Sequence, residues 1–324
     1  MLNIFVPQAQ GMTRVEPGVP PKIPDEAVWI DLLEPTPEEE KFVEAALGVD
    51  VPTREEMKEI ETSNRLYEDN GALYMTTTVA AQLDTDRPVS TAVTFILVGN
   101  RLVTNRYLDT KPFQQFITYA EKHPAACPNA LTVLAGLVEA FTERIADVLE
   151  RIGGDLDNLS GSIFARDGRG TPNSRDLRSI IERIGFAGEL NSKARESLVS
   201  LGRLLMFVQQ SGYGALKGEL RDRFRSISRD VTSLSDHASF LGGKVQFVLE
   251  ATLGMINIEQ NDIIKIFSIV AVMLMPPTLV ASIYGMNFHF MPEVSWPFGY
   301  PYALALMVCS GIFPYIYFKR RGWL

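Results

Sequence analysis

Residues 266–292 read IFSIVAVMLMPPTLVASIYGMNFHFMP, and this run decides the architecture of the chain. It contains no Lys, Arg, Asp or Glu, and it is longer than the roughly 20 residues that an α-helix needs to cross a bilayer. A second uncharged run, residues 298–318, follows after a short loop, and Lys319-Arg320-Arg321 comes directly behind it. The two runs predict a membrane hairpin at the carboxyl end of a chain of 324 residues.

The basic residues around the hairpin predict its orientation. The connecting segment 288–299 holds no Lys or Arg, whereas Lys265 precedes the first run and three basic residues follow the second. Basic residues beside membrane spans favour the cytoplasmic side. We therefore expect the loop outside the cell and both termini in the cytoplasm.

Composition excludes several classes of function. A net charge of -8 argues against a nucleic-acid partner and is compatible with divalent cations. The two cysteines are far apart and the three histidines are scattered, so neither a disulfide framework nor a Cys/His zinc spacing can be built. No nucleophile–base pair or phosphate loop stands out. The sequence therefore predicts no enzyme and no cofactor.

Residues 1–125 are typical of a cytosolic α/β domain. Gly99-Asn100 links two β-rich stretches as a tight hairpin, because both residues tolerate positive φ. Thr36 is a plausible helix N-cap and Pro37 suits the first turn. The acidic residues 38–40 are far more typical of that first turn than of a metal cluster. The stretches expected as strands are 3–6, 27–32, 72–81, 89–98 and 101–107.

Residues 126–211 are predicted to form two antiparallel helical arms. Apolar residues step by three and four without a break from Leu131 to Ile163, which is a heptad pattern. The segment 166–172 breaks that pattern, and Ser174 caps a second helix that we expect to run to about Gln210. The apolar positions of both helices are interpreted as a core between helices.

A stalk helix follows and leads into the first membrane run. No proline occurs between Ala215 and Met275, and apolar residues again alternate by four and three. A helix of roughly 65–70 residues would be about 100 Å long and would need neighbours along its apolar seam. We expect other subunits to supply these neighbours. The remaining segments are assigned as 215–263, cytosolic part of the stalk; 264–287, first transmembrane helix; 288–299, external loop; 300–318, second transmembrane helix; and 319–324, basic cytosolic tail.

One face of the stalk and first span carries a stripe of residues at spacings of three and four. If the stripe faced the axis of an oligomer, each residue would form a ring. The rings would be polar at the outer end, apolar at a constriction and acidic in an inner vestibule. This order suits a cation pore that closes when water leaves the apolar constriction. Ordinary packing of small residues between membrane helices explains the stripe equally well. Its members are Glu250, Gly254, Asn257, Asn261, Ile264, Phe267 or Ser268, Ala271, Met275, Thr278 and Ser282.

Pro276-Pro277 lies in the middle of the first span. These residues lack amide hydrogens, so the carbonyl groups of Val272 and Met273 lose their helical partners. In lipid the freed carbonyls should face protein or a water-filled path. A simple packing kink is the alternative interpretation.

The stretch Tyr284-Gly285-Met286-Asn287, followed by a short loop, a last span and a basic tail, resembles the CorA family of magnesium and cobalt transporters, part of the metal ion transporter superfamily with the Gly-Met-Asn motif. Further matching residues occur in the same order: Pro276-Pro277-Thr278-Leu279, Met291-Pro292-Glu293, Trp296, Phe298-Gly299-Tyr300 and Tyr317-Phe318-Lys319-Arg320-Arg321-Gly322-Trp323. The resemblance spans the chain loosely at the N-terminus and closely from about Gly254.

The resemblance implies a homopentameric Mg²⁺ channel in a bacterial inner membrane, with Co²⁺ and Ni²⁺ as secondary ions and Mg²⁺ as a regulator. It assigns the selectivity filter to Gly285, Met286 and Asn287, with the Asn287 amide touching a hydrated Mg²⁺. Such a filter spares the ion the cost of losing its water. The resemblance also assigns Thr278, Met275 and Asn261 to the pore and Ile264 and Phe267 to an apolar gate.

The chain departs from the family in its external loop. His289 stands where relatives often carry a carboxylate, which leaves Glu293 as the only acid of the loop. We hypothesise that protonation of His289 lowers divalent uptake. Two alternatives stay open: a zinc or other transition-metal transporter of the same superfamily, and a membrane-tethered scaffold that conducts no ion.

Overall fold

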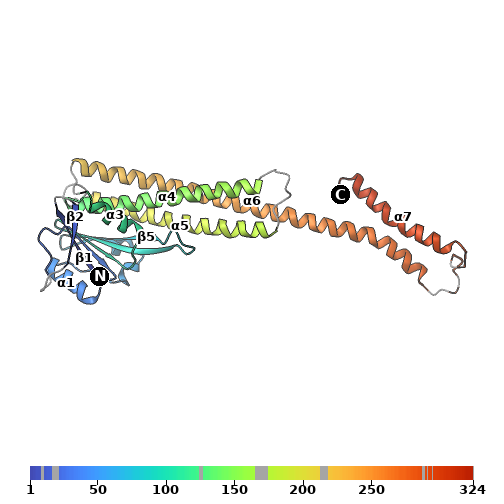
Figure 1. Ribbon diagram of the computed structural model, residues 1–324, viewed down its shortest axis with the longest axis horizontal. Helices are drawn as coiled ribbons and strands as arrows, with labels where there is room; N and C mark the ends of the chain where they lie inside the picture. The colour runs from blue at the N-terminus through green and yellow to red at the C-terminus, as the bar shows by residue number, and fades with distance from the viewer. Residues whose placement is uncertain are drawn as a thin grey trace. The chain divides into compact units, whose positions relative to one another are not determined.

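The chain forms two compact units in the computed structural model. Unit 1 comprises Met1–Arg166 and Arg178–Leu249, and unit 2 comprises Asp167–Leu177 and Glu250–Leu324. Figure 1 shows the order of the elements along the chain. The structure describes residues 1–8, 11–16, 22–123, 127–164, 174–211, 218–286, 289, 291–293 and 295–323.

Unit 1 contains a seven-stranded sheet of order β2-β1-β3-β7-β6-β5-β4. β3 and β7 pair in parallel, and the other neighbours are antiparallel. The predicted Gly99-Asn100 hairpin is confirmed, since β6 ends at Val98 and β7 begins at Arg101. The strands are β1 Leu2–Gln8, β2 Gly11–Val15, β3 Trp29–Leu33, β4 Leu66–Asp69, β5 Ala72–Ala81, β6 Val89–Val98 and β7 Arg101–Arg106.

The predicted helix after Thr36 is α1, Pro37–Leu47, and Thr36 caps it in a capping box with Glu39. The Glu39 carboxylate also accepts hydrogen bonds from the amino group of Met1 at 2.9 Å and from the amide of Leu2 at 2.9 Å. Glu39 therefore caps the start of α1 and also holds the beginning of β1 in place. α1 covers one face of the sheet, where a buried apolar cluster includes Ile30, Val43 and Val103.

The other face of the sheet packs against helices that the sequence did not all reveal. Trp29 stacks on Phe5 at 4.5 Å and lies 6.2 Å from Phe113 of α3, Lys111–Ala120. Phe113 in turn meets Phe141 of α4, Ala130–Phe164, edge to face at 5.7 Å. The sequence analysis missed α3, the edge strands β2 and β4, and two short pieces, η1 Glu56–Lys58 and α2 Thr62–Arg65.

Three long helices run side by side in unit 1 (Figure 1). α4 and α5, Ser174–Gln210, have the predicted extents, and α6, Gly218–Tyr284, continues through Pro276 and Pro277 as the predicted single helix. Asn191 of α5 donates to the carbonyl of Ala238 at 2.9 Å, and Lys244 contacts Asp157 of α4 at 2.7 Å. The seam residues of α6 buried in this way are Phe224, Ile227, Val231, Ala238, Leu241 and Val248.

These contacts correct one expectation. The stalk seam within unit 1 is covered by α4 and α5 of the same chain, so the expectation that other subunits cover it is wrong there. The reason is that the arms bring their own apolar heptad faces, which bury the seam of α6 without a second chain.

Unit 2 contains the carboxyl part of α6 and α7, Gly299–Arg320. Both helices have a stretch apolar enough to cross a membrane, with mean hydropathies of 2.1 for α6 and 1.4 for α7, and only 6% of each stretch is buried inside the protein. Side chains this apolar and this exposed require an apolar surrounding.

Candidate functional site

The Gly-Met-Asn motif begins at the end of α6. The amide of Gly285 donates to the carbonyl of Ala281 at 3.0 Å, and that of Met286 donates to the carbonyl of Ile283 at 3.2 Å. Both residues are exposed and continue the last turn of the helix. Asn287, the proposed ion-contacting residue, lies outside the described residues, so its role stays a prediction.

One face of α6 in unit 2 packs against α7. A methyl group built on Gly311 of α7 would lie 3.4 Å from Cγ of Pro277 and 3.5 Å from the carbonyl oxygen of Met273. Ile269 is buried on this face. The half-buried residues that share it are Met273, Pro276, Pro277, Val280 and Tyr284. A glycine here lets the two backbones approach closely, as is common between membrane helices.

The freed carbonyl of Met273 therefore faces protein, as the sequence analysis allowed. Pro277 cannot donate to it, and it lies beside the glycine of α7 rather than beside a bulky side chain. The helix stays continuous through both prolines. Hence Pro277 and the carbonyl of Met273 form a contact with Gly311 of α7.

The predicted pore stripe occupies the opposite face of α6. At about 100° per residue, the positions of Ile264, Phe267, Met275, Thr278 and Ser282 lie roughly opposite the face centred on Ile269 and Val280. All five are exposed, and the exposed fractions of Ile264, Phe267 and Met275 are 62%, 72% and 70%. Within unit 2, no described residue buries this stripe, which is the condition for it to line a path.

Thr278 presents a defined chemistry on that face. Its hydroxyl donates to the carbonyl of Leu274 at 2.7 Å. With the hydrogen committed to the helix, the oxygen lone pairs are left as acceptors. An exposed acceptor of this kind suits the hydrogen atoms of the water shell of a cation.

The inner residues of the stripe lie in a different setting. Asn261 and Ile264 line an open cleft of about 500 Å³ together with Phe318 and Trp323 of the C-terminal segment. Both stay exposed, as does Glu250, the first residue of this part of unit 2. The cleft places the predicted inner pore residues next to the end of α7, a proximity that spacing along α6 could not reveal.

The external loop approaches the start of α7 closely. A methyl group on Gly299 would lie 2.1 Å from the carbonyl oxygen of Glu293, so no larger residue fits at that position. Trp296 packs against Phe298 and Tyr302 at about 6 Å. His289 and Glu293 are both exposed. The sequence analysis used Gly299 only as part of the family match and missed this contact.

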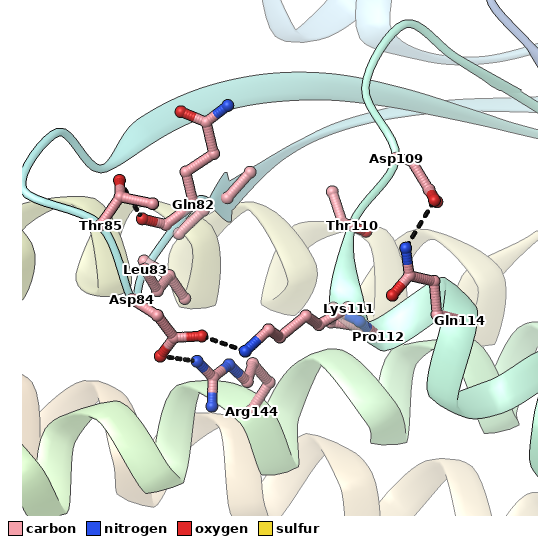
Figure 2. A pocket seen from close by; sticks show the side chains of 12 residues that line it. Gln82, Leu83, Asp84, Thr85, Asp109, Thr110, Lys111, Pro112, Gln114 and Arg144 are labelled. Carbon is pink, nitrogen blue, oxygen red and sulfur yellow. Dashed lines mark hydrogen bonds and ion pairs between the residues drawn. The ribbon is translucent and has the colours of Figure 1, made fainter.

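A polar cluster of unit 1 also escaped the sequence analysis. Asp84, between β5 and β6, forms ion pairs with Lys111 of α3 and with Arg144 of α4 (Figure 2). It also pairs with Arg151 of α4 at 3.1 Å. The hydrogen bond from Lys111 is the largest influence and holds the pKa of Asp84 well below its usual range. The cluster edges a cavity of about 280 Å³ and joins the sheet to two helices.

Residues that could hold a bare metal ion do not gather in the described ranges, where no group of three His, Cys, Asp or Glu side chains occurs. Apart from the carboxylate of Glu250, the polar groups of the stripe are hydroxyls and amides. Their oxygens can accept hydrogen bonds from the water shell of an ion.

The comparisons with known proteins identify the family of the chain. Residues 24–320 match the family described as CorA-like Mg²⁺ transporter protein. The chain is 38% identical over its full length to the magnesium transport protein CorA of Salmonella typhimurium and to that of Escherichia coli K12, each covered completely. The complete structure of the CorA magnesium transporter from Methanocaldococcus jannaschii superposes with a TM-score of 0.79 at 19% identity, covering 100% of this chain and 99% of that one. The chain belongs to the CorA family of Mg²⁺ transporters.

Proposed function

We propose that this protein is a homopentameric channel through which the membrane potential drives Mg²⁺ into the cytoplasm. The observation that carries the proposal is the uncovered face of α6 opposite α7, which leads from Ile264 to the Gly285-Met286 turn. Several copies that brought this face to a common axis would line a path with it. Family membership supports Mg²⁺ as the transported ion.

The filter is proposed at Gly285, Met286 and Asn287, at the external end of that path. Mg²⁺ dehydrates reluctantly, so recognition of its first-shell waters costs less than their removal. The Asn287 amide oxygens form the outer ring, and the acceptor oxygens of Thr278 and Ser282 follow below it. Met275 continues the path toward the gate.

The gate is proposed at Ile264 and Phe267, whose apolar side chains are largely exposed. A ring of such side chains blocks ions by excluding water, and a small outward shift of α6 would rewet it. Asn261 and Glu250 follow on the cytoplasmic side. The carboxylate of Glu250 attracts divalent cations there.

The membrane potential supplies the driving force. Two charges entering a negative interior gain about 4.6 kcal/mol per 100 mV, so no nucleotide hydrolysis is needed. The proposed location is a bacterial inner membrane with both termini in the cytoplasm. Co²⁺ and Ni²⁺ are secondary ions, because their hydrated forms resemble hydrated Mg²⁺ in charge and size.

Divalent flux into proteoliposomes tests the proposal. Wild type, Asn287→Ala and Val308→Ala, an exposed position of α7, are compared with Mg²⁺ and Zn²⁺ offered separately. We expect Mg²⁺ entry that depends on a negative interior, is lost in Asn287→Ala and is kept in Val308→Ala. Flux of Zn²⁺ alone would favour a transition-metal transporter, and flux of neither ion would favour a scaffold.

A further inference from the structure

Unit 1 contains a cleft of about 390 Å³ lined by three arginines that form no ion pair with any described residue. Arg65 ends α2, while Arg195 and Arg203 lie on α5. Positions 195 and 203 are two turns apart, about 12 Å along the helix axis, on the same face. β5 lies beside α5 (Figure 1) and contributes Thr78 to the lining of the cleft.

The absence of partners follows from the sequence of α5. Arg178 and Lys193 on this helix pair with Glu182 and Glu189 one turn away. The residues three and four positions from Arg195 and Arg203 carry no charge. Within the described part of the chain, none of the three cleft arginines forms an ion pair.

Hydrogen-bond donors without acceptors point into the same region. Arg65 donates through Nη2 to the hydroxyl of Thr78 at 2.7 Å, but its Nε is buried and has no partner among the described residues. The Ser200 hydroxyl oxygen accepts from the Thr77 hydroxyl at 2.8 Å and from the Thr78 amide at 2.9 Å. Both its acceptor positions are filled, so its own hydrogen is free to be donated.

The cleft is poor in acceptors. Among the described residues, the one acidic side chain that lines it is Glu196, which already accepts a hydrogen bond from Ser90 at 2.8 Å. Three guanidinium groups against one carboxylate leave an excess of positive charge in a chain whose net charge is -8. A site with these properties favours a ligand that brings several anionic oxygens at once.

We propose that this cleft binds a phosphate-bearing anion, with Arg65, Arg195 and Arg203 as its ligands and the Ser200 hydroxyl as an additional donor. The planar guanidinium fork matches two oxygens of a phosphate group, and charged hydrogen bonds of this type are about twice as strong as neutral ones. The site is separate from the proposed ion path, and its test does not depend on transport.

Isothermal titration of the full-length protein in detergent, in Mg²⁺-free buffer, tests the proposal with two probes. Pyrophosphate represents a soluble phosphate compound, and dihexanoyl phosphatidic acid represents a lipid headgroup. We expect saturable binding of at least one probe, and the probe that binds identifies the source. The double variant Arg195→Ala/Arg203→Ala should weaken binding by at least about tenfold, which corresponds to the loss of one strong charged contact.

Two controls separate the site from general electrostatics and from folding. Arg183→Ala removes an exposed arginine of α5 outside the cleft and should leave the affinity within about twofold of wild type. Arg65→Lys keeps the charge but loses the Nε donor and the planar fork, so it should also weaken binding. Far-ultraviolet circular dichroism checks that each variant is folded.

Three results would overturn the proposal. The first is that neither probe shows saturable binding. Equal losses in Arg183→Ala and in the double variant would show that only net charge matters. A change in oligomer mass by light scattering in the double variant, without anion binding in wild type, would assign the arginines to a contact with carboxylates of a second copy.

Discussion

Gly311 of α7 lies directly against Pro277 of α6, so closely that a methyl group in place of the glycine hydrogen would be 3.4 Å from the proline ring. The same methyl group would be 3.5 Å from the carbonyl oxygen of Met273, which Pro277 has deprived of its helical donor. Gly311 of α7 and Pro277 of α6 therefore form one contact between the two helices, on the face of α6 that α7 covers.

Enlarging Gly311 should separate the two helices. Gly311→Val requires a shift of α7 and should lower the free energy of unfolding by about 1–3 kcal/mol, as overpacking does. It should also lower Mg²⁺ flux, because α6 loses its support. Gly311→Ala, whose methyl group meets ordinary contact distances, is the matched control. Thermal unfolding in detergent and flux are measured on both, and equal behaviour of the two variants would contradict the contact.

Thr278 should contribute through its hydroxyl rather than its shape. Thr278→Val keeps the volume but removes the acceptor oxygen, and we expect Mg²⁺ flux to fall by about tenfold, the equivalent of roughly 1.4 kcal/mol. Thr278→Ser restores the hydroxyl and should recover most of the flux. Initial rates in proteoliposomes give the comparison. If the valine variant conducts as well as the serine variant, this face of α6 does not line the path.

The buried ion pair of Arg106 and Asp31 should matter for stability. Arg106 donates to both oxygens of Asp31 at 2.9 Å, and both side chains are almost completely buried. Burial opposes the charge, yet the hydrogen bonds to Asp31 and Asp109 outweigh it and raise the pKa of Arg106. Arg106→Ala leaves the buried carboxylate of Asp31 without this partner and should lower the free energy of unfolding by about 3–5 kcal/mol.

Arg101, on the same strand, supplies the control for that variant. It lies 3.8 Å from an exposed carboxylate of Asp25, so Arg101→Ala should cost only about 1 kcal/mol. Unfolding midpoints of the two variants are compared with wild type. Similar losses of stability in the two variants would show that the ion pair of Arg106 with Asp31 contributes no more than an exposed one.

The Asp84 cluster should make stability depend on acid. The folded-state pKa of Asp84 lies below its ordinary value of 3.8, chiefly because Lys111 donates a hydrogen bond to it. A depressed carboxyl pKa contributes stability above the unfolded pKa and loses it as the pH falls toward the folded pKa. We expect Asp84→Asn to be less stable than wild type at pH 7, with the difference shrinking below about pH 4. A difference that does not change with pH would assign the effect to packing.

The pH dependence of uptake tests His289. Protonation of this exposed side chain adds positive charge at the external loop, where Glu293 is the only acid. Lowering the external pH should therefore reduce Mg²⁺ influx, and His289→Glu should remove that component. Influx is measured from pH 8 to pH 5 with the internal pH fixed. Identical profiles for the two proteins would refute the hypothesis.

The sequence by itself determined the features that its longest local patterns carry, although it did not reveal the short amphipathic helix α3. The uncharged runs and the unbroken spacing predicted the helical hairpin and the continuous α6, because length, charge and period are properties of a segment alone. Thr36 predicted the start of α1 for the same reason. The Gly285-Met286-Asn287 motif predicted the family, which the comparisons confirmed.

Only the tertiary structure decided which residues meet across the chain. The cover of the α6 seam by α4 and α5, the contact of Gly311 with Pro277, and the buried pair of Asp31 with Arg106 each join residues from different elements. The type of a residue does not predict which residue, distant in the sequence, its side chain will contact. The short strands β2 and β4 were missed because their stability comes from pairing with β1 and β5, not from a pattern of their own.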